Sequence, residues 1–293
     1  MAGTDHIRNP VEWGIEQLRL AAHSVEEATQ ALGGRTGDAD AGPEIRRITL
    51  ADLRTVLARG VDDFGACRTD VIALFAIYPL IGLVLVRLAF GYDMLPLVLP
   101  LAFGFALVGP VAAVGLYEMS RQREGGAGIN WGHALNVVRS PRIGGVLVLG
   151  LVLLGILIAW LVVAQAIYAV TLGPEPPVSL AAFAHDTMAT TAGWTMIAAG
   201  AVAGLFFAVL VLMIGAVSFP LLLDRDVGLP MAVATSMRVV LANPLPMAAW
   251  GVLVILALAI GSLPLFLGLA IVVPVLGHAT WHLYRLTVAA DAD

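Results

Sequence analysis

The sequence predicts an all-α, polytopic helical membrane protein with six transmembrane helices, arranged as three hairpins that each follow an amphipathic interfacial helix. Composition is the first observation: 59% of the 293 residues are hydrophobic and 13% are charged, whereas soluble domains carry roughly 25% charged residues. Apolar runs of about 20 residues also recur, which is the length of helix needed to cross a hydrocarbon core of ~30 Å. Runs such as 146–163 do not alternate apolar with polar residues, so helices rather than β-strands are the predicted spans.

Apolar length places six spans within residues 49–290, the predicted membrane domain. They cover 71–90, 95–117, 143–170, 193–223, 247–262 and 264–284. Only a tight Gly261-Ser-Leu-Pro264 break separates the last two, so five spans is the alternative count. The fold class does not depend on this choice, but the side on which the chain ends does.

Arginine placement favours six spans. The segments before the first span, between the second and third, and between the fourth and fifth hold Arg54, Arg59, Arg68, Arg121, Arg123, Arg139, Arg142, Arg225 and Arg238. The segment at 171–192 holds no arginine. Cytoplasmic loops are enriched in basic residues, so the N-terminus is expected in the cytoplasm. With six spans Arg285 lies on that side too, and the C-terminus is also cytoplasmic.

A threefold repeat divides the membrane domain into units at 49–121, 129–225 and 229–285. Val108–Arg121 and Val272–Arg285 align without gaps and share a Val-x-Pro-Val-like core and the final arginine. Each unit begins with a short amphipathic segment, the second at 130–140 and the third at 230–243. The first has Thr49 as its cap and an apolar stripe of Leu50, Leu53, Leu57, Val61 and Phe64. Because all three hairpins start inside, an inverted-repeat transporter is not favoured.

Residues 1–48 are predicted to be cytoplasmic, with an amphipathic helix at 10–32 and a flexible linker at 33–44. The apolar stripe of this helix consists of Val11, Ile15, Leu18, Ala22 and Val25. A membrane-surface anchor is one interpretation of the stripe. Packing on the protein's own cytoplasmic face is favoured, because anchors for anionic lipid are rich in Lys and Arg, whereas this segment carries Glu12, Glu16, Glu26 and Glu27.

The C-terminal run Gly277-His-Ala-Thr-Trp-His-Leu-Tyr-Arg285 is the densest group of polar and aromatic residues. His278, His282 and Arg285 follow each other at i, i+4 and i+7 and share one helix stripe. Two imidazoles one turn apart could bind a metal or haem, so His278 and His282 are the metal candidates. A metalloprotease would need Glu after the first histidine, where Ala279 stands. A packed membrane boundary is the favoured interpretation, and neither a metal nor a cofactor is expected.

A second group surrounds Asp224 and Arg225 at the end of the fourth span. A carboxylate beside a membrane is costly unless it is paired, so Asp224 is expected to pair with Arg121 or Arg285 of the other units. The six residues of the expected cytoplasmic-face cluster are Arg121, Asp224, Arg225, His278, His282 and Arg285. A site for a phosphate or lipid headgroup, built on these arginines, is the alternative.

Several motifs resemble those of one known family. They are Ile7–Trp13, Asp62–Phe64 with Arg68–Asp70, Gly109-Pro110 with Gly115–Arg121, Ser218–Arg225, Asn243-Pro244 and Gly277–Arg285. The chain resembles, along nearly its whole length, the bacterial predicted integral membrane proteins catalogued as domain of unknown function 2189. The resemblance implies a bacterial inner-membrane location and supplies no catalytic residues.

These observations predict a non-enzymatic scaffold or accessory subunit in the bacterial inner membrane, in contact with the lipid bilayer and with other membrane proteins. A formal net charge of −5 argues against nucleic acid as a partner. Transport of a small or lipid-like molecule is the first alternative and predicts a mid-membrane pocket lined by Gln165. A haem- or metal-binding protein that uses His278 and His282 is the second. No catalytic residue is expected.

Overall fold

The computed structural model describes residues 42–75, 87, 95–97, 100–101, 113–126, 143–264 and 266–289, with the backbone alone for 67–75. The described residues are helical, and their one extended pairing is an isolated antiparallel bridge between Ile45 and Val288. The all-α prediction is confirmed for this part of the chain. The predicted helix at 10–32, most of the first two predicted spans and the interfacial segment at 130–140 lie outside it.

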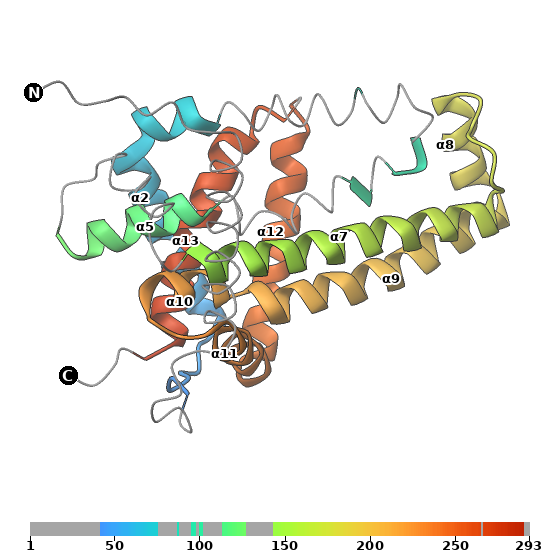
Figure 1. The fold of residues 1–293 in the computed structure, drawn as a ribbon. Coiled ribbons are helices and arrows are strands. Elements are labelled where there is room, and N and C mark those ends of the chain that lie inside the picture. The colour runs from blue at the N-terminus through green and yellow to red at the C-terminus, as the bar shows by residue number, and fades with distance from the viewer. Residues whose placement is uncertain are drawn as a thin grey trace, which may run out of the picture.

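Helix α13 (Leu269–Thr287) packs along α2 (Leu50–Phe75) at the left of Figure 1. Gly60 makes this packing close, because a Cβ at that position would lie 2.7 Å from the Ala279 Cβ and 2.8 Å from the Val275 carbonyl oxygen. Carbon atoms in ordinary contact are ~3.5–4.0 Å apart. A residue larger than glycine would therefore push the two helix backbones apart.

The short helix α5 (Val114–Glu124) packs on a different part of α13. Gly277 marks this contact, because a Cβ there would collide with the side chain of Leu116 on α5. Leu116 and Tyr117 are almost completely buried. Glycines thus bring α13 close to both α2 and α5.

The buried face of α2 differs from the predicted stripe. Leu50 and Val61 are 47% and 53% exposed, whereas the buried positions include Val56, Gly60 and Asp63. The predicted stripe, of which Leu53 is buried, is therefore not the same as the face packed on α13. The actual contact with α13 is centred on a glycine and continues to a buried carboxylate.

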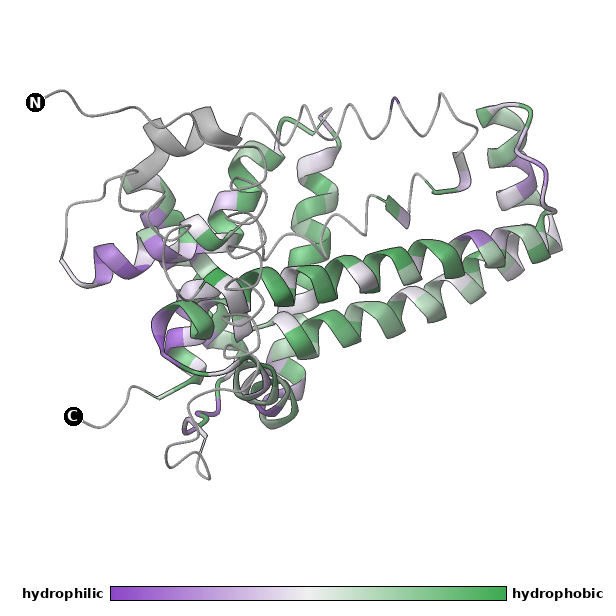
Figure 2. Cartoon of the chain, viewed as in Figure 1, coloured by the Kyte–Doolittle hydropathy of each residue, from purple (hydrophilic) through white to green (hydrophobic). Residues whose placement is uncertain are grey.

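A long hairpin extends away from these helices. It consists of α7 (Ile143–Thr171) and α9 (Thr191–Gly215), which lie side by side, with α8 (Leu180–Ala189) at the far end (Figure 1). The Thr190 hydroxyl accepts a hydrogen bond from the Gly193 amide and caps α9 at 2.9 Å. Figure 2 shows that hydrophobic residues cover α7 and α9 along most of their length.

Three further helices follow α9 and return toward α13. They are α10 (Ser218–Asp224), α11 (Leu229–Ala242) and α12 (Pro244–Ser262). In Figure 1 the α7–α9 hairpin runs across the direction of α12 and α13. The chain turns from α12 to α13 through 263–268, close to the predicted break, and Phe266 there has a positive φ of 65°.

Asn243, at the corner between α11 and α12, fixes the start of the described chain. Its Oδ1 accepts a hydrogen bond from the Ile48 amide at 2.7 Å, and its Nδ2 donates to the Arg46 carbonyl at 3.2 Å. The Arg46 amide donates in turn to the Thr287 carbonyl at 2.8 Å. Residues 42–48 are therefore held between the α11–α12 corner and the end of α13. They include 42–44, the last three residues of the linker that was predicted to be flexible.

Three stretches of the described chain are long and apolar enough to cross a membrane: Ile143–Thr171, Thr191–Asp224, which combines α9 and α10, and Pro244–Ser262. They correspond to the third, fourth and fifth predicted spans. The sixth prediction, 264–284, falls on α13, which is not among the three because its C-terminal half is polar. These helices agree with the prediction of a helical membrane protein. The arrangement of six spans stays a prediction.

Candidate functional site

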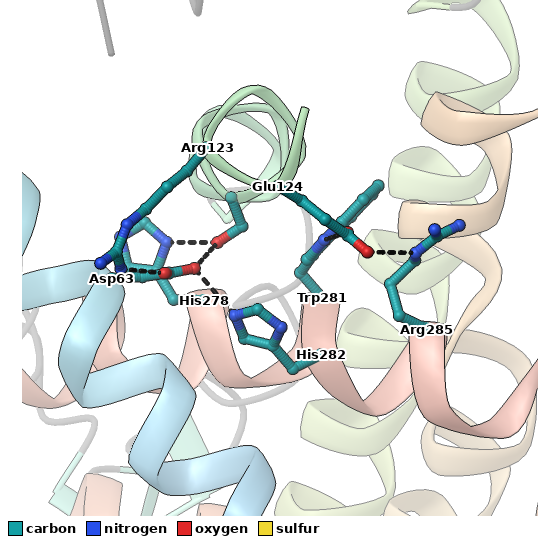
Figure 3. A network of polar contacts seen from close by, with 8 residues as sticks. Asp63, Arg123, Glu124, His278, Trp281, His282 and Arg285 are labelled. Atoms are coloured by element: carbon teal, nitrogen blue, oxygen red, sulfur yellow. Dashed lines mark hydrogen bonds and ion pairs between the residues drawn. The ribbon is translucent and has the colours of Figure 1, made fainter. Parts of the chain in front are cut away.

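Asp63 is the centre of a polar network that joins α2, α5 and α13 (Figure 3). Asp63 is only 5% exposed. Its Oδ2 accepts hydrogen bonds from the Ser120 hydroxyl at 2.6 Å and from His282 Nε2 at 2.9 Å. Its Oδ1 is bound by the Arg123 guanidinium. A single carboxylate therefore connects three helices.

These donors decide the charge of Asp63. Burial by itself raises the pKa of the carboxyl group, but hydrogen bonds from His282 and Ser120, the charge of His282 and a hydrogen bond from Arg123 outweigh it. The pKa falls from an ordinary 3.8 to about 2. Asp63 is consequently ionised at neutral pH, which a buried acid tolerates only when it is paired and hydrogen-bonded.

Ser120 stands between Asp63 and His278. The Ser120 hydroxyl donates its hydrogen bond to Asp63. In the 2.8 Å contact between Ser120 Oγ and His278 Nδ1, the imidazole N–H is therefore the donor. This order differs from a Ser-His-Asp triad, in which the histidine stands in the middle and accepts the serine proton. Ser120 and His278 are 2% and 0% exposed. The three side chains connect α2, α5 and α13.

The Nε2 atom of His278 is buried and has no hydrogen-bond partner among the described residues. With a proton on Nδ1, a neutral imidazole presents an acceptor at Nε2. His278 and His282 use their bonded nitrogens on different partners, Ser120 and Asp63. In the part of the chain that the structure describes, no three His, Cys, Asp or Glu residues are grouped so that they could hold a metal ion.

The network continues toward the end of α13 through two further acids, of which Figure 3 shows Glu124. Glu124 on α5 accepts hydrogen bonds from Trp281 Nε1 and from Arg285 Nε, both at 3.0 Å. Asp224 on α10 accepts from the Tyr284 hydroxyl at 2.6 Å and lies 3.4 Å from Arg285 Nη1. Burial lowers the pKa of Arg285, but Glu124 and Asp224 outweigh this effect and raise it. Four helices are thus joined by acids that contact α13.

Four of the six predicted cluster residues take part in the network, and the other two, Arg121 and Arg225, lie close enough to Asp224 and Tyr284 for their charges to interact. His278, His282, Arg285 and Asp224 belong to the network. Arg121 instead binds Glu118 on its own helix through two contacts of 2.7 Å, and Arg225 donates to the Ala289 carbonyl. Asp224 is paired with Arg285, and its charge is close enough to raise the pKa of Arg121 as well, after the larger effect of Glu118.

Sequence reasoning missed Asp63, Ser120 and Glu124. Asp63 follows Val56 by seven residues and Gly60 by three, so an acid lies on the buried stripe of α2. That position could have identified it, because a charge on a packed face requires a partner. Nothing in the local sequence of α5 distinguishes Ser120 or Glu124 from exposed polar residues.

An apolar hollow of about 790 Å³ lies on the α7–α9 hairpin. It is lined by Val163, Ala198, Ala199, Val202, Ala203, Phe206 and Phe207. Gln165 is not among these residues and is exposed on α7. The hollow therefore differs from the pocket expected for a transporter, which Gln165 was predicted to line.

Comparison with known proteins supports a membrane protein of this kind. Residues 98–224 match the model of a family described as predicted integral membrane protein (DUF2189). The resemblance is thereby confirmed for a region that contains the motif at 109–121 and nearly all of 218–225. The other motifs, including 62–70 and 277–285, lie outside the matched region. No curated protein and no solved structure matches the chain.

Proposed function

Because residues 98–224 match a family of predicted integral membrane proteins, we propose that the chain is a non-enzymatic scaffold or accessory subunit of the bacterial inner membrane. In this proposal it crosses the membrane six times as three hairpins, and both termini are cytoplasmic. The three long apolar stretches support the third, fourth and fifth of these spans. The arginine-free segment 171–192 supports an outer position for α8.

One observation carries the functional part of this proposal: two acids of the network are bound by donors from other helices. Asp63 is satisfied by Ser120, Arg123 and His282, and Glu124 is satisfied by Trp281 and Arg285. A general acid or base needs a partner in the substrate and a pKa near the working pH, whereas Asp63 has a pKa of about 2. A network of this kind supports a role in holding helices.

The outer surface supports lipid and protein contacts. Large apolar residues are exposed along the α7–α9 hairpin, among them Leu151 at 66%, Val202 at 73% and Phe206 at 63%. Contiguous exposed apolar surface is typical of membrane or protein interaction sites. A rigid network beside such a surface is what a scaffold requires, because partners bind best to elements that do not reorganise.

Copurification tests the function. The tagged full chain is extracted in a mild detergent, and mass spectrometry identifies the proteins and lipids recovered with it. A scaffold predicts a reproducible membrane-protein partner at a defined stoichiometry. Recovery of the chain alone, in every growth condition and detergent, contradicts the proposal.

Cysteine accessibility tests the topology. Cys67 is the only cysteine and is first replaced by serine. A cysteine is then placed at His185 in α8 or at Asp226, which follows α10. With a reagent that cannot cross the membrane, intact cells should be labelled at position 185, and at 226 only after permeabilisation. Labelling of both positions from one side would exclude this arrangement and favour a hairpin that lies along the membrane, across α12 as in Figure 1.

A further inference from the structure

The outer face of α11 is apolar and has no described partner. Met237 is 39% exposed, Leu241 is 67% exposed and Leu245, at the start of α12, is 65% exposed. The opposite face packs on the rest of the molecule through the buried residues Leu229, Ala232, Thr235, Ser236 and Val239. In Figure 1 α11 lies at the lower edge, beneath α9. Met237 and Leu241 stand at i and i+4 on α11 and form a stripe on which a second helix could pack.

The described chain begins at the edge of this face. A Cβ on Gly42 would lie 2.6 Å from Arg238 Nη1 and 2.9 Å from Met231 Sδ, and Arg238 also donates to the Pro43 carbonyl at 3.4 Å. Gly42, the first described residue, therefore lies beside α11. The segment 33–41 spans at most about 30 Å when extended. Since α11, with 14 residues, is only about 21 Å long, a helix that precedes this segment can reach the whole face.

The N-terminal segment has the complementary chemistry. Residues 10–32 are predicted from sequence to form an amphipathic helix with Leu18 in the middle of its apolar stripe. Its acids are Glu12, Glu16, Glu26 and Glu27, against a single arginine, Arg19. Arg238 on α11 is exposed, and so is Arg46, whose carbonyl binds Asn243 at the end of α11. Opposite charges around two apolar stripes favour one docked orientation.

We propose that residues 10–32 dock as a helix on the apolar face of α11, with Leu18 against Met237 and Leu241 and the acidic residues beside Arg238. The contact is intramolecular, so the short linker keeps the helix at a high effective concentration near its site. The inference does not depend on the scaffold function or on the number of spans.

Cross-linking in the full chain tests the contact directly. In a Cys67→Ser background, Leu18→Cys is combined with Leu241→Cys and treated with a short bifunctional maleimide. A cross-link within one chain is expected. The matched control is Ser24→Cys with Leu241→Cys, because Ser24 lies away from the predicted apolar stripe and should cross-link several-fold less. Equal cross-linking of the two pairs, or none of either, overturns the proposal.

Protection of Leu241→Cys supplies a second measurement that does not need a cross-link. Leu18→Asp should raise the rate at which maleimide labels the cysteine at position 241 roughly fivefold or more, whereas Ser24→Asp should leave that rate unchanged. A fivefold change corresponds to the loss of a contact of about 1 kcal/mol. The exposed Val252→Cys on α12 serves as a control that neither substitution affects. Fast labelling in every variant shows an open face and overturns the proposal. Labelling that is slow and that Leu18→Asp does not accelerate has another cause. If spin-labelled lipid also quenches the fluorescence of a label at position 241, the bilayer covers α11, and this result overturns the proposal too.

Discussion

Replacement of Gly60 by alanine tests whether close packing of α2 on α13 positions the polar network. The new Cβ would lie 2.7 Å from the Ala279 Cβ and 2.8 Å from both the Ala279 amide nitrogen and the Val275 carbonyl oxygen. Normal contact between carbon atoms begins at ~3.5 Å, so α2 must move by most of an ångström. Two of the three neighbouring atoms are backbone, and no side-chain rotation relieves the contact.

The magnitude follows from three effects on the free energy of unfolding. Overpacking costs roughly 1–3 kcal/mol, and loss of one hydrogen bond to a charged group costs about 1.5–3 kcal/mol. The second cost arises because Asp63 lies one helical turn after Gly60 and contacts Ser120 at 2.6 Å, a distance that a displaced helix cannot keep. Alanine recovers about 0.5–1 kcal/mol through its higher helix propensity. Gly60→Ala is therefore expected to destabilise the protein by roughly 2–4 kcal/mol.

Gly65 on the same helix provides the matched control, because a Cβ there would meet nothing within 4 Å. Gly65→Ala should stabilise the chain by about 0.5–1 kcal/mol through helix propensity alone. Denaturant unfolding of both variants in the same detergent measures the difference. If Gly60→Ala unfolds at the same denaturant concentration as Gly65→Ala, the close contact between α2 and α13 does not exist in solution and the reasoning fails.

Other contacts lead to separate predictions. The pKa of Asp63 is about 2 in the folded protein against an ordinary 3.8, so the stability that it contributes should be complete above about pH 4 and lost as the pH falls through about 2. Asp63→Asn should be less stable at neutral pH and should lack this part of the acid dependence, which denaturant unfolding at a series of pH values measures. Asn243→Ala leaves the Ile48 amide without its acceptor and should cost about 1–3 kcal/mol, with faster hydrogen exchange at Ile48; unchanged exchange would contradict the contact. Trp160→Phe removes the 3.0 Å hydrogen bond to the Pro100 carbonyl and should lower the free energy of unfolding by about 1 kcal/mol, measured beside Trp194→Phe as the exposed control.

The long apolar helices were predictable from sequence because a span must be apolar along its whole length. The predicted spans at 143–170 and 247–262 correspond to α7 and α12 within a few residues. The predicted span at 193–223 corresponds to α9 and α10, which are separated near Ala216. Pro220 explains this break, because it has no amide proton to donate to the carbonyl four residues earlier.

The network was not predictable because its contacts join residues distant in sequence. Asp63 meets Ser120 and His282, which follow it by 57 and 219 residues. Apolar periodicity identifies which face of a helix is buried, but a glycine contact such as Gly60 contributes no apolar signal. Leu50 and Val61 of the predicted stripe therefore lie off the face packed on α13, and the acid on that packed face was overlooked.

The chemistry of the Gly277–Arg285 run is explained by what α13 contacts. Four side chains of the run reach groups on other helices: His278 meets Ser120, Trp281 and Arg285 meet Glu124, and His282 meets Asp63. Thr280 instead donates to the Leu276 carbonyl of its own helix. Such hydrogen bonds need backbones that approach closely, which Gly277 permits on the side of α5. The two histidines bind different partners, and in the described part of the chain no three His, Cys, Asp or Glu residues are grouped to hold a metal ion. The arrangement of partners thus favours a helix junction over a metal centre.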